Sequence, residues 1–296
     1  MPSSLSDQAT PGVRQLYQLI QREAGQRILM AQQESPMRGR HDQEMDYLRK
    51  TTGRLPAIRG LDFIHDDFDG VVDRALRWHD RGGIVTICWH TGVEGFGYPD
   101  SKQECPDFNA LLTPGTKENG LLMRRWDHGA RALARLQDRG VPVLWRPFHE
   151  FDGQWFWWGK GGPEVFQRLW RAMHDYFTGD CGLHHLIWVL GYADWVKERW
   201  YPGDDCVDIL GSDTYKGVTT HFASFEKLRQ LSPDKPRAFH ECGVVPDLGR
   251  FYQSGAVWSW LMPWHSYWLT HGNTPERLKS VYRDERSITL KELPGF

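Results

Sequence analysis

The strongest constraint on the fold is an alternation between short apolar runs and amphipathic segments along the 296-residue chain. Most of the apolar runs are nearly continuous, which is typical of strands that are buried on both faces of a parallel sheet. The pattern predicts eight strands, at residues 27–33, 56–64, 83–90, 141–150, 185–192, 207–215, 237–243 and 257–264.

Helical periodicity fills most of the intervals between these runs. The expected helices lie at residues 13–24, 68–81, 121–139, 163–177, 222–231, 248–254 and 275–282. Strand and helix alternating in this way predict a parallel sheet with right-handed crossovers, and eight strands favour closure into a barrel. Because no linker, repeat or low-complexity stretch divides the chain, we expect an α/β fold, a single (β/α)₈ TIM-barrel domain over residues 1–296.

Charge and hydropathy narrow the range of partners. The formal net charge is −2 and no basic stripe is present, which argues against nucleic acid as a partner. No apolar run approaches the roughly 20 residues of a membrane helix. Residues 1–8 lack the basic and apolar regions of a signal peptide, so the protein is expected either to be cytoplasmic or to have lost such a signal. We expect a monomer that needs no cofactor.

The five cysteines, at positions 88, 105, 181, 206 and 242, show no metal-binding spacing. They are expected to be mostly free thiols, with one or two disulfides if the protein is secreted.

Polar side chains close the apolar runs. The longest expected non-helical inserts, 92–119 and 151–162, follow the third and fourth strands, and in a barrel such loops lie on the C-terminal face with the active site. Polar groups at the ends of buried strands are costly unless they are partnered, so their concentration at one rim predicts a functional site there. The strand-end residues are Gln32, Gln33, Glu34, Trp89, His90, Thr91, Arg146, His149, Glu150, Asp213, Tyr215, His240, Glu241, Trp264 and His265.

Two of these residues, Glu150 and Glu241, form a candidate catalytic pair. They end the fourth and seventh expected strands, which face each other across a barrel mouth, so their carboxyl groups can converge. A proton-donating carboxyl and a second carboxylate are the minimum equipment for glycoside hydrolysis, and a separation of about 5–5.5 Å would indicate the retaining mechanism. The 15 tryptophans fit this reading: most are expected in the core, and others can offer flat apolar surfaces to sugar rings.

The run from Arg146 to Gly159, RPFHEFDGQWFWWG, strongly resembles the fourth-strand signature of glycoside hydrolase family 26. That family contains mainly endo-β-1,4-mannanases and belongs to a barrel clan with catalytic glutamates on strands four and seven. Most of the clan has Asn before the acid/base, whereas this family has His, as at His149 here. The segment 213–215 is similar to the family's Asp-x-Tyr, segment 240–243 to its nucleophile strand, and Trp264 to its strand-eight aromatic residue.

The resemblance implies roles for individual residues. Glu150 would be the general acid/base and Glu241 the nucleophile of a retaining, endo-acting mannanase. Tyr215 would donate its hydroxyl to Glu241 and Arg146 would support that carboxylate by its charge, although an ordinary barrel-mouth aromatic is the alternative for Tyr215. The remaining expected sugar contacts are His149 at the bound sugar, Trp155 at the glycone wall, Trp264 beneath the central sugar, and Asp213 and His90 at hydroxyls beside the cleavage point.

Three alternatives stay open. Four histidines at strand ends suggest a metal site as one alternative. Barrel metallohydrolases, however, need His-x-His on the first strand, and this chain has Gln32, Gln33 and Glu34 there, so no metal is expected. A non-catalytic carbohydrate-binding barrel would lose one carboxylate, and both are present. Within the resemblance the expected substrate is a β-mannan (mannan, glucomannan or galactomannan), with mixed-linkage β-glucan and β-1,3-xylan as alternatives.

Overall fold

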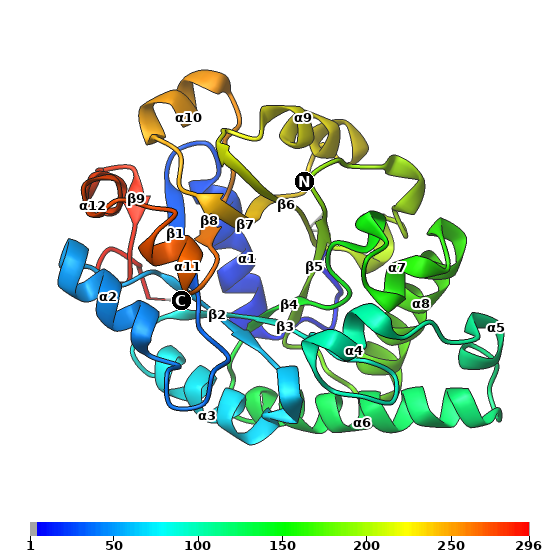
Figure 1. The fold of residues 1–296 in the computed structure, drawn as a ribbon. Coiled ribbons are helices and arrows are strands. Elements are labelled where there is room, and N and C mark those ends of the chain that lie inside the picture. The colour runs from blue at the N-terminus through cyan, green and yellow to red at the C-terminus, as the bar shows by residue number, and fades with distance from the viewer. Residues whose placement is uncertain (1–4, 296) are drawn as a thin grey trace.

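Eight parallel strands form a closed barrel in the computed structural model, which describes residues 5–295 (Figure 1). The strands pair in chain order from β2 to β8, and β1 closes the ring by pairing with both β8 and β2. The strands are β1 (Ile28–Gln33), β2 (Ile58–Asp62), β3 (Ile84–Cys88), β4 (Val143–Arg146), β5 (Leu186–Tyr192), β6 (Ile209–Val218), β7 (Arg237–Val244) and β8 (Trp260–Pro263). A two-residue strand, β9 (Ser287–Ile288), adds to β1.

Helices surround the barrel and connect its strands (Figure 1). The longer ones are α1 (Pro11–Glu23), α2 (Gln43–Thr52), α3 (Phe68–His79), α6 (Lys117–Gln137), α8 (Pro163–Asp175), α9 (Phe222–Leu231), α10 (Leu248–Ser254) and α12 (Pro275–Arg283). Short α-helices are α4 (Tyr98–Gln103), α5 (Phe108–Leu111), α7 (Trp157–Lys160) and α11 (Tyr267–Thr270). Short 3₁₀ or π turns are η1 (Ile64–Asp66), η2 (Phe151–Gly153), η3 (Tyr176–Asp180), η4 (Glu198–Trp200) and η5 (Asp204–Cys206).

All eight expected strands and all seven expected helices are confirmed, with ends that differ by a few residues. The expectation of non-helical inserts is wrong in part. The insert 92–119 contains α4 and α5, and the insert 151–162 contains η2 and α7. Helices of four to six residues make too few turns to show a 3.6-residue period, which explains why they were not predicted. The longer α2 was missed as well.

The barrel interior is a packed core. Leu29, Ile84, Leu144 and Ile187 are fully buried or nearly so in one apolar cluster with the inward-facing side of α1. That helix begins after Thr10, whose hydroxyl accepts from the backbone N–H of Val13, and it carries five buried apolar side chains, Val13, Leu16, Tyr17, Leu19 and Ile20. α1 therefore covers the end of the barrel opposite the strand-end loops, and the mouth at the C-terminal ends is left for function.

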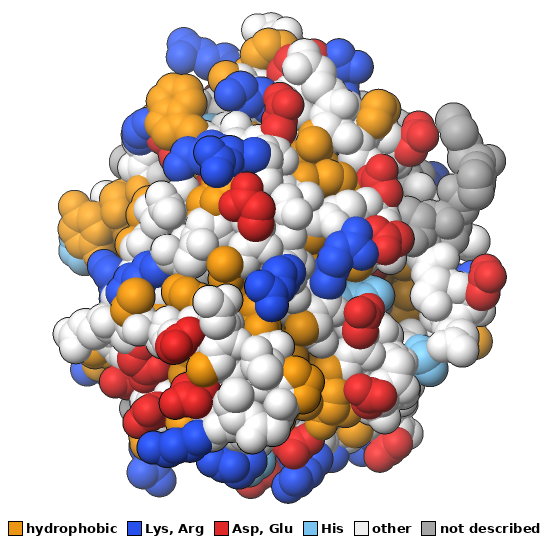
Figure 2. Space-filling view, turned by 90° about the vertical axis from the view of Figure 1, so that its right-hand side faces the viewer, with side chains coloured by type: hydrophobic (Ala, Val, Ile, Leu, Met, Phe, Trp, Pro, Cys, Tyr) orange, Lys and Arg blue, Asp and Glu red, His pale blue; other side chains and the backbone are white. Residues whose placement is uncertain are grey.

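Other whole-chain expectations agree with the structure. Within residues 5–295, no helix is both long and apolar enough to cross a bilayer. All five cysteines are free thiols. Figure 2 shows one side of the molecule, on which acidic and basic side chains are interspersed.

Candidate active site

The loop after β4 carries Glu150 on an unusual backbone. Phe148 and Glu150 both have positive φ, 52° and 54°, a region that non-glycine residues seldom enter. The backbone N–H of Glu150 donates to the carbonyl of Gly191 at the end of β5, with a distance of 2.7 Å. Local strain of this kind persists where the surrounding structure dictates it and is concentrated at functional sites. Here it presents Glu150 to the barrel mouth.

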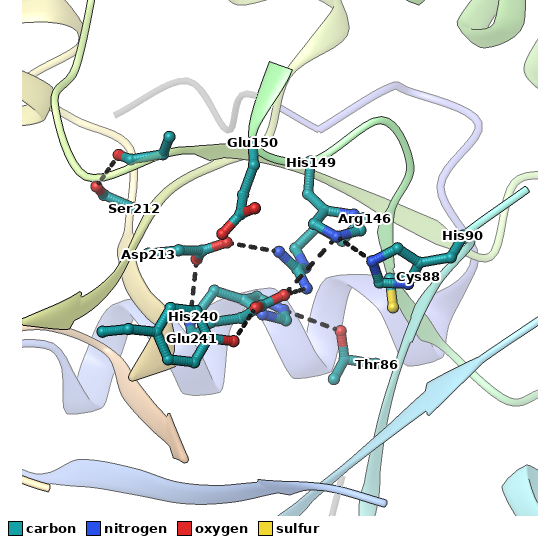
Figure 3. A network of polar contacts seen from close by, with 12 residues as sticks. Thr86, Cys88, His90, Arg146, His149, Glu150, Ser212, Asp213, His240 and Glu241 are labelled. Carbon is teal, nitrogen blue, oxygen red and sulfur yellow. Dashed lines mark hydrogen bonds and ion pairs between the residues drawn. The ribbon is translucent and has the colours of Figure 1, made fainter. Parts of the chain in front are cut away.

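Glu241 on β7 is held by three groups from other strands (Figure 3). The Tyr215 hydroxyl donates to its Oε2 with a distance of 2.6 Å, and the Arg146 guanidinium pairs with its Oε1. Asp213 accepts from the Glu241 backbone N–H through Oδ1 and from Arg146 through Oδ2, each with a distance of 3.0 Å. Charge-assisted hydrogen bonds from fixed donors keep a carboxylate ionised and aimed.

The two glutamates converge. One carboxyl oxygen from each of Glu150, Asp213 and Glu241 lies within 4.8 Å of the others. A closest approach of at most 4.8 Å between these oxygens fits the spacing of about 5–5.5 Å in retaining glycosidases better than the roughly 6.5–9.5 Å that inverting enzymes need to seat a water molecule. Burial raises the pKa of Glu150 to about 7, and the charge of Glu241 adds to that rise, while Arg146 and the indole of Trp155 oppose it. Glu150 is thus suited to hold a proton beside an ionised Glu241.

A second chain of polar contacts lies on the other side of Glu241. Asp62 accepts from His90 Nδ1 with a distance of 2.6 Å, and His90 Nε2 lies 3.0 Å from His149 Nε2. Burial alone would lower the pKa of His90, but the adjacent Asp62 carboxylate raises it above the ordinary value. Burial, with the charges of Arg146 and His90, holds the pKa of His149 well below its usual range. The pair is therefore arranged as a charged His90 that donates to a neutral His149.

A cavity of about 270 Å³ at the barrel mouth is lined by both glutamates, both of these histidines and Tyr215. Trp264 is half-buried in its wall, and Tyr98, Phe156 and Trp268 complete the aromatic lining. None of these last three was predicted, because they lie in or directly before the short helices α4, α7 and α11, beyond the strand ends. Asp62 was missed as well, although it ends β2 and the strand-end rule that identified His90 applies to it equally.

The structure brings together Glu150, Glu241, His90, His149 and Tyr215 as expected, all lining the one cavity. Arg146 pairs with Glu241 from beneath the cavity, as expected, whereas Asp213 is placed differently from the expectation. The side chains of Arg146 and Asp213 are 0% exposed, and both oxygens of Asp213 are already bonded. Their burial corrects the expectation that Asp213 contacts a sugar hydroxyl, since it meets Arg146 and Glu241 instead.

The tryptophans of the 146–159 run divide as their burial dictates. Trp157 and Trp158 are buried, and their indole N–H groups donate to the carbonyls of Thr91 and His149 with distances of 2.8 Å. Trp155 is 40% exposed and donates to Glu150 Oε2 with a distance of 2.8 Å. It flanks the carboxyl of Glu150 and is not part of the cavity wall around Glu241.

Potential metal ligands at the mouth have other partners. The oxygens of Asp213 and Glu241 accept from Arg146, and Asp62 accepts from His90 and from the backbone N–H of Ile64. Two of the four strand-end histidines lie elsewhere: His240 contacts Thr86 beneath the site at 3.2 Å, and His265 contacts Ser266 at 2.9 Å. The guanidinium of Arg146 occupies the position in which a cation shared by Asp213 and Glu241 would lie.

The fold and the site together define the class. A (β/α)₈ barrel with carboxylic acids that converge at its mouth is the arrangement of a glycoside hydrolase domain. The chain belongs to glycosyl hydrolase family 26, because the model of that family matches residues 5–292.

Relatives and solved structures agree with this assignment. The chain is 33% identical to a mannan endo-1,4-beta-mannosidase of Thermothelomyces thermophilus over 97% of its own length. It spans 62% of that relative, and 54% and 51% of two mannan endo-1,4-beta-mannosidases of Piromyces sp. A beta-mannanase from a symbiotic protist of the termite Reticulitermes speratus, solved with gluco-manno-oligosaccharide, superposes with a TM-score of 0.89 at 29% identity, covering 99% of this chain and 98% of that one. The beta-(1,4)-mannanase of Podospora anserina superposes with a TM-score of 0.87 at 31% identity, covering 100% and 70%.

Proposed function

We propose that the chain is a retaining, endo-acting glycoside hydrolase that cleaves β-1,4-mannosidic bonds in mannan, glucomannan or galactomannan. The observation that carries this proposal is the convergence of Glu150 and Glu241 within 4.8 Å, with only Glu241 bonded to Arg146 and Tyr215. The substrate class is supported by the relatives, whose names specify mannan or mannanase.

In the first step the Glu241 carboxylate attacks the anomeric carbon, and the bond to the leaving oxygen breaks. Glu150 transfers its proton to that oxygen, so the departing chain leaves as an alcohol and Glu150 becomes a carboxylate. Tyr215 and Arg146 hold the Glu241 carboxylate in place until it attacks. Glu150 retains a proton near neutral pH because burial and the charge of Glu241 raise its pKa to about 7.

In the second step a water molecule attacks the anomeric carbon of the glycosyl-enzyme ester. Glu150, now ionised, takes a proton from that water, and the bond to Glu241 breaks to restore its carboxylate. Two displacements at one carbon return the product with the configuration of the substrate. The covalent bond to Glu241 keeps the sugar on the enzyme until the leaving chain has departed and a water molecule has taken its place.

Neighbouring residues are assigned by their position in the cavity. Trp264 serves as a platform beneath the central sugar, and the imidazole rings of His90 and His149 lie beside it, since all three residues line the cavity. Trp155 borders the leaving-group side, because it touches the proton donor Glu150 from outside that cavity. This assignment replaces the glycone wall that was expected for Trp155.

The test measures reducing ends released by the wild type and Glu241→Ala from galactomannan, glucomannan, mixed-linkage β-glucan and β-1,3-xylan. We expect release from the mannans and a fall of several orders of magnitude in the variant, because removing a nucleophile abolishes the covalent route. NMR of the first-formed anomer should show retained β configuration.

Each other outcome has a definite meaning. Activity on glucan or xylan alone would leave the proposed mechanism unchanged and replace mannan as the proposed substrate. Activity that survives in Glu241→Ala would refute the nucleophile assignment. Silence on all four polymers, with mannan binding intact, would favour a non-catalytic carbohydrate-binding barrel.

A further inference from the structure

Two tryptophans differ from the rest in their exposure. All fifteen lie within residues 5–295, and only Trp155 and Trp195 are exposed, at 40% and 62% of their surface. Trp155 is explained by its contact with Glu150. Trp195 lies in the loop after β5, and nothing in the mechanism above uses it. A large, flat indole surface that is left in water and held in one orientation is available to stack on a ligand.

The indole of Trp195 is covered on one side by a cation. Lys216 Nζ lies 4.5 Å from the centre of the ring, and the same ammonium group pairs with Asp194, the residue before Trp195. The backbone carbonyl of Asp194 accepts from the Ser224 hydroxyl with a distance of 2.8 Å. Since Lys216 occupies one face, the 62% exposure of Trp195 must come from the other face and the ring edge. The free surface is thus flat, apolar and held in place from behind.

The loop that carries Trp195 is fastened to the loop that carries Glu150. The backbone N–H of Ala193 donates to Asp152 Oδ1 with a distance of 2.8 Å, and Lys197 Nζ donates to the carbonyl of Asp152. The Glu150 backbone itself is bonded to Gly191. Trp195 lies four positions after Gly191, so their Cα atoms are at most about 14 Å apart. A short run of linked sugars leaving Glu150 can span that distance.

We infer that Trp195 is a binding platform for a hexose residue in the leaving-group portion of a β-linked polysaccharide. The inference rests on the proposed function and extends it beyond the cavity around Glu241. The ring lies outside that cavity, on the side of the proton donor. A pyranose presents a flat C–H face that an indole accommodates without regard to hydroxyl pattern. The platform would therefore favour long polymeric substrates over short ones.

The experiment compares Trp195→Ala and Trp195→Phe with the wild type on two substrates. Galactomannan places sugars on both sides of the cleaved bond, whereas 4-nitrophenyl β-mannobioside has no sugar on the leaving-group side. We expect kcat/KM of Trp195→Ala on galactomannan to fall about five- to tenfold, as expected when one aromatic ring no longer stacks on a sugar, mainly through KM. Activity on the nitrophenyl substrate should stay unchanged, and Trp195→Phe should lose less.

Tyr267→Ala is the matched control. Tyr267 is 63% exposed and has one face stacked on His271, but it lies in α11 after β8 rather than beside the Glu150 loop. The inference predicts no selective loss on galactomannan for this variant. An equal loss in Tyr267→Ala, an equal loss on both substrates in Trp195→Ala, or no loss on galactomannan would overturn the platform.

A binding measurement separates this inference from the mechanism. Titration calorimetry of mannohexaose into Glu241→Ala, with and without Trp195→Ala, should show weaker binding in the double variant. If wild type hydrolyses mannan but the two affinities agree, the platform is refuted and the proposed function stands. If wild type is inert on both substrates and mannohexaose does not bind, both fail together.

Discussion

The hydrogen bond from Trp155 to Glu150 offers a direct test of how the environment sets the proton donor. The indole nitrogen of Trp155 lies 2.8 Å from Glu150 Oε2, and its N–H group stabilises the charged carboxylate. This hydrogen bond therefore lowers the pKa of Glu150, which burial raises to about 7. Trp155→Phe removes this donor and keeps a flat ring. Without the donor the carboxylate loses stabilisation and the pKa of Glu150 rises.

The magnitude follows from the geometry of this hydrogen bond. A hydrogen bond to a charged group contributes about 1.5–3 kcal/mol net when it is buried. Trp155 is 40% exposed, so water replaces part of the missing donation in the variant. Taking about half of the buried value, the pKa of Glu150 should rise by about 0.5–1, at about 1.4 kcal/mol for each pKa unit.

The assay is the pH dependence of kcat/KM on mannan, which reports on groups of the free enzyme. Glu150 must be protonated for the first step, so kcat/KM falls as pH rises through its pKa. In the Trp155→Phe variant, the basic limb of the pH profile of kcat/KM should be shifted to higher pH. If the indole also binds a sugar, its removal would lower kcat/KM at every pH without moving the limb. An unmoved limb, or one moved to lower pH, would refute the reasoning.

Two further substitutions test the groups that hold Glu241. Tyr215→Phe deletes the 2.6 Å hydrogen bond to Glu241 Oε2, so kcat should fall roughly tenfold to a hundredfold while circular dichroism shows an intact fold. An unchanged kcat would mean that Tyr215 is an ordinary barrel-mouth aromatic. Arg146→Met leaves Asp213 and Glu241 buried without their cation, so urea unfolding at pH 7 should show a loss of about 3–5 kcal/mol. That loss should shrink at pH 5, because burial raises the pKa of Asp213, and without the Arg146 cation this carboxyl takes up a proton more readily; an equal loss at both pH values would contradict a charge-based role.

Much of the site was predictable because catalytic groups in a barrel sit at strand ends. Glu150, Glu241, His90 and Tyr215 each follow an apolar run, and order along the chain placed them on one rim. The resemblance carried by residues 146–159 added the division of roles between the two glutamates. What was missed lies off that pattern: Tyr98 begins the short helix α4 and Phe156 directly precedes the short helix α7, and neither helix is long enough to show a periodicity.

The sequence by itself determined the eight-stranded barrel, because continuous apolar runs separated by amphipathic helices leave few other ways to bury both faces of a sheet. It also predicted that Glu150 and Glu241 face each other from the fourth and seventh strands, and the structure places Glu150 in the loop after β4 and Glu241 within β7. Only the tertiary structure decided which groups act on them. Arg146 pairs with both Asp213 and Glu241, and the carboxylate of Asp62 raises the pKa of His90. Trp155 donates a hydrogen bond to Glu150, whereas Trp157 and Trp158 are buried. These pairings join residues up to 95 positions apart, and the pKa values they set depend on burial and charge spacing, which exist only once the barrel has closed.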